Sequence, residues 1–272
     1  MSDSRASQST VSGPDEIRQL ARTFQYDRYV AALLLPRQHR EALIVLAAFA
    51  AELQRIPFIV SEPMMAAIRF QWWRDQLLAT SGPSAGEQRS GHQLCDALVA
   101  VARNYNLPFG LLQGIIDAAE TENDPTPFAE AAETQQILVK FDGALFELAG
   151  RVLGVDVPRG VWSEAATAYG GARLAAEYAW RKSIGAQTYT SRQCADENDA
   201  FVKPAREAMV AVRARRVEMG KAAKGALLPL ATVEPVLRRV ATQSQQTDAT
   251  KRPLSDFARA RTILWAHWRG LI

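Results

Sequence analysis

The chain has 272 residues, of which 48% are hydrophobic, and a formal net charge of +3. This length and composition allow a sizeable buried core in one large or two small domains. The modest positive charge fits contact with an anionic membrane or an acidic protein but requires neither. No zinc finger, RNP sequence or helix-turn-helix pattern accompanies the charge, so we expect no nucleic-acid partner.

The N-terminal residues 1–13 are small and polar, which predicts a disordered tail ahead of a single helical domain at residues 14–272. The tail lacks the apolar segment of a secretory signal, and Asp3 argues against a mitochondrial presequence. Charges interrupt the longest apolar runs, so no transmembrane helix is expected. Cys95 and Cys194 lack metal-ligand spacing and indicate ordinary thiols in a reducing compartment.

Alanine-rich segments with few β-branched residues favour helix, and no alternating strand pattern is present, so the predicted fold is all-α. The first strong helix is expected from Arg37 to about Ile56, where Pro57 ends or kinks it. The turn Ser61-Glu62-Pro63 then begins a second helix that reaches about Ala79. A later helix is expected from Ala168 to Lys182.

Two features of the sequence resemble binding motifs only superficially. Gly170 and Gly171 are adjacent, as in a dinucleotide-binding loop, but no strand precedes them, so a close crossing of two helices is the better interpretation. His39, His92 and His267 are scattered without the spacing of a metal site, so no metal is expected there.

The C-terminal segment Ser255–Ile272 combines apolar residues at helical spacing with arginines. The apolar set is Phe257, Ile263, Leu264, Trp268 and Leu271, and the basic set is Arg259, Arg261 and Arg269. A helix of this kind can lie in a membrane interface. It can equally pack its apolar face on the domain, and both interpretations stay open.

A frame of short motifs runs from Asp27 to Leu77. The dipeptide Leu35-Pro36 precedes the first helix, the aromatic-led run 47–51 lies inside it, and the tandem Trp72-Trp73 lies in the second. In this layout the chain resembles the squalene/phytoene synthase family, all-α enzymes that join two isoprenyl diphosphates head to head. The resemblance is good over residues 27–155 and traceable to about residue 270. It implies an isoprenoid-synthase-like helical bundle around a central cavity.

In that family an aspartate-rich motif, D-D-x-x-D, follows the aromatic-led run and holds Mg²⁺ against the diphosphate. The matching positions here are Gln54, Arg55 and Phe58. Carboxylates four residues apart share one helix face and one metal cluster, whereas an amide is a poor Mg²⁺ ligand and a phenyl ring is none. The first motif is therefore expected to be degenerate. A new carboxylate at Phe58, buried without metal, should cost on the order of a few kcal/mol of stability.

The family's second motif follows a glycine on a later helix and again places two aspartates four residues apart. Anchored at Gly170, its amide positions are Leu174 and Glu177, and its aspartate positions are Arg181 and Gly185. An anchor one residue later supplies no carboxylate pair either. We therefore expect no catalytic residue, no metal and no cofactor. The two motif helices should still face each other across the cavity, and the former metal site should be neutral or positive.

One branch of the family is similar to this chain in greater detail. The chain has A-E-L-x-R-I at 51–56, S-E-P at 61–63 and I-R-x-x-W-W-R-D at 68–75. That branch includes bacterial proteins and the phytoene-synthase-like assembly factor of mitochondrial respiratory complex I. The similarity implies a non-catalytic protein that acts in assembly of the NADH-quinone oxidoreductase (complex I), with its subunits or other assembly proteins as partners. A lipid-like or isoprenoid chain in the cavity is the other implied ligand. The implied location is cytoplasmic, with peripheral contact at the inner membrane, or the mitochondrial matrix in a eukaryote.

The second helix carries a candidate partner surface, made of Arg69, Trp72, Trp73, Arg74 and Asp75. One tryptophan is expected to fill the core while the other lies at the helix edge. Packing and recognition both explain the motif, so both interpretations stay open.

An active prenyltransferase with metal ligands elsewhere is the alternative function, and it would require Mg²⁺. Its candidate ligands are Glu52, Glu62 and Asp75 on one side and Asp117, Glu120, Glu122 and Asp124 on the other. Glu120 and Asp124 are four residues apart, but Pro125 and Pro127 place them at a helix end, which favours a solvated loop.

Overall fold

The computed structural model describes residues 13–60, 62–81, 89–122, 131–155, 157–183, 201–243 and 254–270. Within these ranges the chain forms helices and no strand, so the all-α prediction is confirmed. The predicted tail lies outside the described residues except for Gly13, which caps the first helix. The predicted motif position Gly185 lies outside them as well.

The first half of the chain contains α1 (Pro14–Phe24), α2 (Tyr26–Leu34), α3 (Arg37–Ile59), α4 (Pro63–Ser81), α5 (Gln93–Asn104), α6 (Phe109–Glu122) and α7 (Ala131–Leu138). A π-helical turn, η1 (Val139–Gly143), joins α7 to α8 (Ala144–Val152). The second half contains α9 (Arg159–Ser183), α10 (Lys203–Ala214), the 3₁₀ turn η3 (Arg216–Glu218), α11 (Lys221–Ala226), the 3₁₀ turn η4 (Leu228–Thr232), α12 (Val233–Gln243) and α13 (Asp256–Arg269).

Helix α3 is the central element of the first half and packs against α1, α2, α5 and α8. Every residue from Ala42 to Leu53 is buried, and alanines at 47, 48, 50 and 51 let neighbouring helices approach closely. Among the described residues, α3 is the one helix long and apolar enough to cross a membrane, and 72% of the qualifying window is buried inside the protein.

Helix α3 continues past the predicted end at Ile56. Pro57 lies inside it, and the helix runs to Ile59. A proline at this position removes one backbone N–H bond near the end of the helix, and only two residues follow it, so little regular structure is lost. The extension carries Phe58 and Ile59 outward to the surface, where both are exposed.

Helix α9 is the central element of the second half and packs against α10, α12 and η1. It begins nine residues before the predicted Ala168. Its two adjacent glycines lie at close approaches: a Cβ on Gly170 would come within 2.6 Å of Leu138, and a Cβ on Gly171 within 3.0 Å of Ala205. The predicted close helix crossing is therefore present, on both sides of α9.

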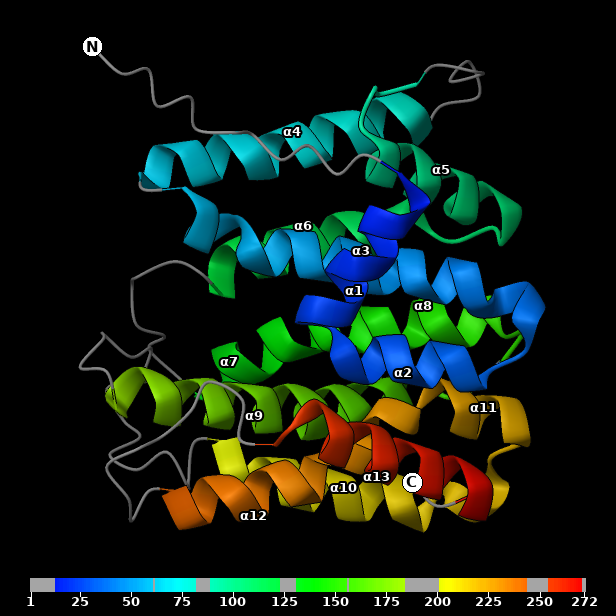
Figure 1. Ribbon diagram of the computed structural model, residues 1–272, viewed down its shortest axis with the longest axis vertical. Helices are drawn as coiled ribbons and strands as arrows, with labels where there is room; N and C mark the ends of the chain where they lie inside the picture. The colour runs from blue at the N-terminus through cyan, green and yellow to red at the C-terminus, as the bar shows by residue number, and fades with distance from the viewer. Residues whose placement is uncertain are drawn as a thin grey trace.

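The buried apolar residues form two clusters. One is built from α1 to α8 with Ile263 and Ala266 of α13, and the other from α8 to α12. Figure 1 shows the helices stacked in layers. Helices α4 and α5 lie at one end, α3 and α8 in the middle, and α9, α10 and α12 toward the other end. The region between α3 and α9 is where the two halves of the predicted site meet.

Candidate functional site

A cavity of about 400 Å³ lies between α3 and α9. Four residues of α3 line it, Gln54, Arg55, Phe58 and Ile59, and five of α9 do so, Tyr169, Ala172, Arg173, Ala176 and Glu177. The remaining lining residues are Phe24, Gln25, Asp27, Glu122, Thr232, Val233, Val236, Leu254 and Arg259. The prediction that the two motif helices face each other across a cavity is confirmed.

Not every predicted motif position reaches this cavity. Leu174 is half-buried and packs on the second apolar cluster instead. Helix α9 includes Arg181, whose side chain lies outside the described residues. Phe58 lies at the rim with 53% of its surface exposed. The expected cost of burying a carboxylate at that position is therefore wrong, because the extension of α3 past Pro57 places the side chain in contact with solvent.

On the α3 side, the first-motif positions bond to protein groups. Gln54 accepts a hydrogen bond on Oε1 from Gln25 Nε2 at 2.5 Å, and Gln25 Oε1 accepts one from Arg28 Nε at 3.2 Å. The neighbouring Arg55 Nε lies 3.1 Å from Glu52 Oε2. Neither of these two atoms has a hydrogen-bond partner. The two side chains therefore form an ion pair that is not aligned as a hydrogen bond.

On the α9 side, Arg173 is the centre of an ion-pair network in the cavity wall, in which the side chains of Asp142, Glu122 and Arg173 are 1%, 12% and 19% exposed. Its Nη1 and Nη2 donate to the two carboxylate oxygens of Glu122 at 2.5 and 2.7 Å, and Nη2 also donates to Asp142 Oδ2 at 3.1 Å. Burial raises the pKa of Glu122, although Arg173 opposes the shift. Burial lowers the pKa of Arg173, but the charges of Glu122 and Asp142 outweigh it and hold that pKa well above its usual range. The guanidinium is therefore charged at any physiological pH.

The second oxygen of Asp142 is bound by another arginine. Arg28 Nη2 donates to Asp142 Oδ1 at 2.6 Å. The Arg28 guanidinium also lies over the rings of Phe146 and Tyr169, at 4.8 and 4.6 Å from their centroids. The π-helical turn η1 contains Asp142 and points this single acid, which is 1% exposed, into the helix bundle between two cations.

A second cluster surrounds Asp27. Arg259 Nε donates to Asp27 Oδ1 at 2.7 Å, while the hydroxyls of Thr232 and Tyr169 donate to Oδ2 at 2.9 and 3.3 Å. Burial and the Asp27 charge raise the pKa of Tyr169, so its hydroxyl keeps the proton it donates. Burial lowers the pKa of Arg259, but Asp27 raises it by more. This cluster joins α2, α9, η4 and α13 at one point.

The cavity lining is formally neutral, as expected for the former metal site. Asp27, Glu122 and Glu177 supply three negative charges, and Arg55, Arg173 and Arg259 supply three positive charges. This balance leaves no net charge to attract a diphosphate or a divalent cation.

The residues around the cavity do not fit the Mg²⁺ that the family resemblance implies. Mg²⁺ needs carboxylate oxygens arranged octahedrally with room for water, whereas the oxygens of Asp27, Asp142 and Glu122 are already held by cations and hydroxyl donors. In the part of the chain that the structure describes, no group of three His, Cys, Asp or Glu side chains is placed to hold a metal.

The carboxylates proposed as alternative metal ligands are not brought together. Arg74 forms ion pairs with Asp117, at 2.7 Å, and with Glu120. Asp75 accepts a hydrogen bond from Gln71 at 2.8 Å on the outer face of α4. Glu52 pairs with Arg55 and Glu122 with Arg173, Glu62 is exposed at the start of α4, and Asp124 lies outside the described residues.

The tandem tryptophans of α4 divide as expected between core and edge. Trp73 is 2% exposed and meets the ring of Phe49 edge-on at 5.3 Å, while Trp72 is half-buried between Trp73 and His92. Packing therefore explains both rings. What α4 leaves to solvent in this motif is Asp75 and part of Arg69, next to the exposed apolar side chains of Met64, Met65 and Ile68.

Four residues that organise the cavity had no predicted role in it: Asp27, Arg28, Asp142 and Arg259. A signal for one of them is present in the sequence, since Asp142 is an acid inside the otherwise apolar run Phe141–Phe146. An acid so placed must be paired when buried. Its partners lie 114 and 31 residues away, a separation that helical periodicity does not reveal.

Comparisons with known proteins agree with this architecture. The sequence model of a family described as squalene/phytoene synthase matches residues 21–173. Proteins named NADH dehydrogenase (ubiquinone) complex I, assembly factor 6, are 28% identical in Bos taurus and 26% identical in Homo sapiens, over 137 residues. Those alignments cover 50% of this chain and 40% of each relative, so the match spans less than half the length of these curated relatives. Squalene synthase HpnC from Alicyclobacillus acidocaldarius shares the fold, with a TM-score of 0.56 at 17% identity over 94% of both chains.

Proposed function

The chain belongs to the squalene/phytoene synthase family, and from this premise we propose that it is a non-catalytic member that acts in assembly of the respiratory NADH-quinone oxidoreductase (complex I). The observation that carries the proposal is the pairing of the cavity's buried carboxylates. Arginines hold Glu122, Asp142 and Asp27, so the oxygens of these acids are occupied by protein groups and are not free to bind Mg²⁺.

The motif positions support the same proposal. At the cavity, Gln54, Phe58 and Glu177 stand where a pair of metal-binding aspartates and an amide would be needed. A diphosphate carries its charge into a mixed apolar cavity only with cations to neutralise it, and each arginine in the lining already has an acidic neighbour or network. Binding a diphosphate would therefore require breaking buried ion pairs.

The assembly role rests on the relatives. The proteins of Bos taurus and Homo sapiens named as complex I assembly factors match this chain over 137 residues, half of its length, although over only 40% of their own length. We propose complex I subunits or other assembly proteins as partners. The corresponding location is the cytoplasm with peripheral contact at the inner membrane, or the mitochondrial matrix in a eukaryotic cell.

The proposed partner surface is the outer face of α4. Arg74 is engaged with α6, Trp73 is buried, and Trp72 is half-buried against Trp73 and His92. The most accessible part therefore consists of Asp75, part of Arg69 and the exposed Met64, Met65 and Ile68. Methionines adapt to irregular partners, and an exposed apolar patch of this kind marks contact sites. The cavity remains available for an apolar lipid-like ligand, through the half-exposed side chains of Phe24 and Phe58 at its rim.

The enzymatic alternative is tested in vitro. Purified protein is incubated with Mg²⁺ and farnesyl or geranylgeranyl diphosphate, and pyrophosphate release is measured against a boiled control. We expect no release above the control. Sustained turnover would establish the alternative, an active head-to-head prenyltransferase of the squalene/phytoene synthase type.

The assembly role is tested in cells. Deleting the gene should lower the amount of assembled NADH-quinone oxidoreductase on native gels and leave the isoprenoid profile unchanged. The double variant Arg69→Glu/Asp75→Arg should fold normally and fail to restore assembly. The matched control Asp15→Arg/Arg22→Glu, two exposed positions on α1, should restore it. Intact assembly with altered isoprenoids after deletion would favour the prenyltransferase.

A further inference from the structure

The C-terminal helix α13 packs on the protein through a narrow face. Ile263 is fully buried and Ala266 is 6% exposed, and Arg259 anchors the helix through its ion pair with Asp27. The apolar packing expected from the sequence is thus present, but it uses only part of the apolar residues. The larger ones lie on the other side of the helix.

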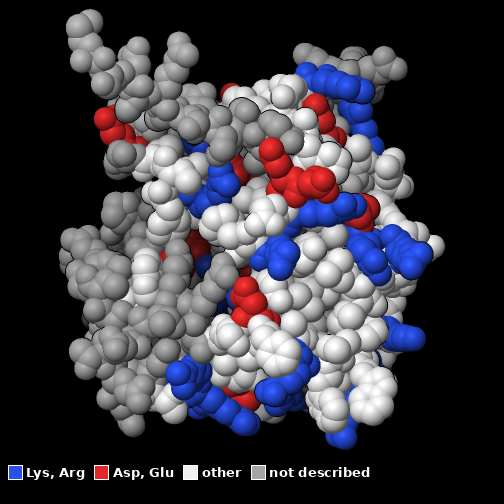
Figure 2. All heavy atoms as spheres, viewed as in Figure 1, with Lys and Arg blue, Asp and Glu red and all other residues white. Residues whose placement is uncertain are grey.

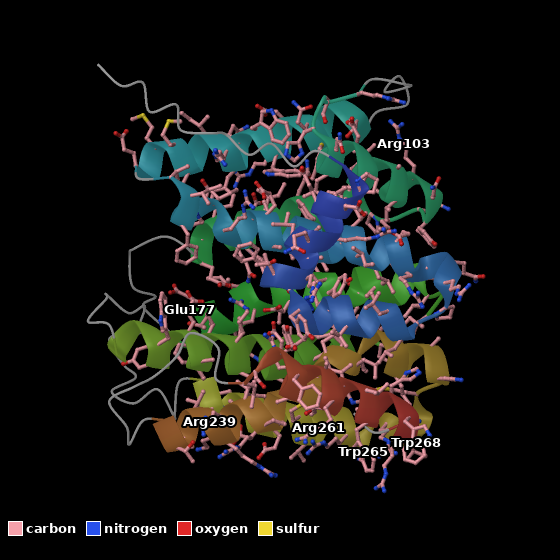
Figure 3. The ribbon with its side chains drawn as sticks, viewed as in Figure 1. Arg103, Glu177, Arg239, Arg261, Trp265 and Trp268 are labelled. Carbon is pink, nitrogen blue, oxygen red and sulfur yellow. The ribbon has the colours of Figure 1, made fainter. Side chains whose placement is uncertain are left out.

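The outward face of α13 is aromatic. Phe257 is 77% exposed, Leu264 54%, Trp265 51% and Trp268 74%. Residues 257, 261, 264, 265 and 268 follow the three- and four-residue spacing of one helix face, so these side chains form one continuous stripe. Figure 3 shows Trp265 and Trp268 beside each other near the end of the helix, and their ring centroids are 5.6 Å apart. We call this stripe, with its arginines, the α13 face.

Arginines are interleaved with these rings, and no acid shares the stripe. Arg261 and Arg269 are exposed on α13, and the Arg269 guanidinium lies 4.3 Å from the centroid of the Trp265 ring. The one acid of the helix, Asp256, is at its first position and is engaged in an interaction. Figure 2 shows basic side chains gathered along the same end of the molecule, where α12 contributes the exposed Arg238 and Arg239.

Both ends of α13 are capped, which fixes the helix that carries this face. Ser255 caps its N-terminus by accepting a hydrogen bond from the Ala258 N–H at 3.2 Å, and Gly270 ends it in the left-handed conformation with φ of 60°. Fourteen residues give a length of about 21 Å. The α13 face is therefore a convex ridge of fixed shape and not a groove.

We propose that the α13 face binds the surface of an anionic lipid bilayer. Amphipathic helices of this kind lie in the interface with Trp, Phe and Leu inserted to about 5–10 Å and basic side chains at the headgroups. Tryptophan is favoured there because one end of its ring system is apolar and the other is a hydrogen-bond donor. The arginines extend their apolar stems along the rings and keep their charge at the phosphates.

The observations favour a bilayer over a protein partner. Hot-spot aromatics in protein interfaces fill desolvated pockets or present a pocket to the partner, whereas the rings on α13 stand out from a ridge. The α4 patch of Met64, Met65 and Ile68 lies at the far end of the helix stack and has no comparable set of exposed arginines (Figure 1). Of these two apolar patches, the α13 face is therefore the one with charge complementary to anionic headgroups. The inference does not depend on the role of the cavity.

The test is vesicle flotation of the full chain with two compositions, phosphatidylcholine alone and phosphatidylcholine containing phosphatidylglycerol or cardiolipin. We expect binding to the anionic vesicles that weakens with added salt, and weak binding to the neutral ones. Free phosphate at the same concentration should not compete, because it lacks an apolar phase. Equal binding to both compositions, or none to either, would overturn the proposal.

Variants identify the face. Trp265→Ala/Trp268→Ala should lower the partition coefficient by about tenfold or more, and Arg261→Gln/Arg269→Gln by about fivefold per arginine. The controls Met64→Ala/Ile68→Ala and Arg22→Gln/Arg37→Gln remove similar groups elsewhere and should bind like the parent. Each variant is first checked for an unchanged melting temperature. If the α4 control loses binding and the α13 variants keep it, the assignment is wrong and the α4 patch is the docking surface.

Discussion

Arg173 on α9 and Glu122 at the end of α6 are joined by two parallel hydrogen bonds, at 2.5 and 2.7 Å. The same guanidinium reaches Asp142, so one cation contacts two acids beside the cavity, and Arg28 supplies the second positive charge. A bidentate pair of this kind is fixed in geometry as well as charge. It links α6 to α9 at the wall of the cavity.

Removing the cation should be strongly destabilising. Arg173→Met leaves the buried charges of Glu122 and Asp142 without their shared partner, which should lower the free energy of unfolding by about 3–5 kcal/mol. Urea unfolding of both proteins measures the difference. The control Arg238→Met breaks a pair whose arginine is 75% exposed, and its effect should stay below about 1 kcal/mol. Equal effects of the two variants would mean that the Arg173 network does not carry the stability assigned to it.

The raised pKa of Glu122 makes stability depend on pH with a defined sign. Burial is the main cause, and it favours the protonated acid in the folded state relative to the unfolded state. Protonated Glu122 therefore makes its full contribution to the free energy of unfolding when the pH is below the ordinary carboxyl pKa. That contribution is lost as the pH rises through the raised pKa of the folded state. As pH rises above the ordinary carboxyl pKa of about 4, the parent should lose stability relative to Glu122→Gln. The same comparison for Glu62→Gln, on the surface, should give no such trend, and a trend of opposite sign for Glu122→Gln would contradict the assignment.

Magnesium should leave the protein unchanged. A ligand stabilises a protein only by binding its folded state more tightly than its unfolded state, and the carboxylates at the cavity are held by arginines. Millimolar Mg²⁺ should therefore not shift the melting temperature in differential scanning fluorimetry, with CaCl₂ at equal ionic strength as the control. A rise specific to Mg²⁺ would show that a metal site exists after all.

Restoring one motif should not restore chemistry. The double variant Gln54→Asp/Phe58→Asp places two carboxylates four residues apart on α3, but α9 still presents Arg173 and Glu177 to the cavity. Both halves must be positioned together for catalysis, so pyrophosphate release should remain at background. Because Phe58 is 53% exposed, its new carboxylate stays hydrated, and the loss of stability should be smaller than for a buried site. Any turnover by this variant would show that the α9 side retains function.

Composition and turn signals predicted the all-α class and the approximate bounds of the motif helices, whereas the cavity between those helices was predicted from the family resemblance. Helical composition, the turns before Arg37 and Pro63, and the paired glycines of α9 each reflect local chemistry, which a single sequence records. The ion pairs could not be predicted in the same way. Asp27 and Arg259 are 232 residues apart, and which arginine meets which acid depends on how the helices stack. The exposure of Phe58 was missed for a local reason, because a proline near the end of a helix breaks one hydrogen bond without ending the helix.

The close approach at Gly170 provides a test of the packing around this network. A Cβ at that position would lie 2.6 Å from Leu138 Cδ2 and 2.7 Å from Asp142 Oδ2. Leu138 can move slightly, but two arginines hold Asp142 in place. Gly170→Ala should therefore overpack the site and lower the free energy of unfolding by about 1–3 kcal/mol.

Gly114 in α6 is the matched control for this substitution, because no atom lies within 4 Å of the position of its Cβ. Gly114→Ala should stabilise the protein by roughly 0.5–1 kcal/mol, since alanine loses less backbone entropy in a helix. Urea unfolding of the two variants gives opposite signs if Asp142 is fixed by its arginines. If Gly170→Ala were as stable as the parent, Asp142 would have to move freely, and the network would not be the rigid centre of the cavity that these contacts describe.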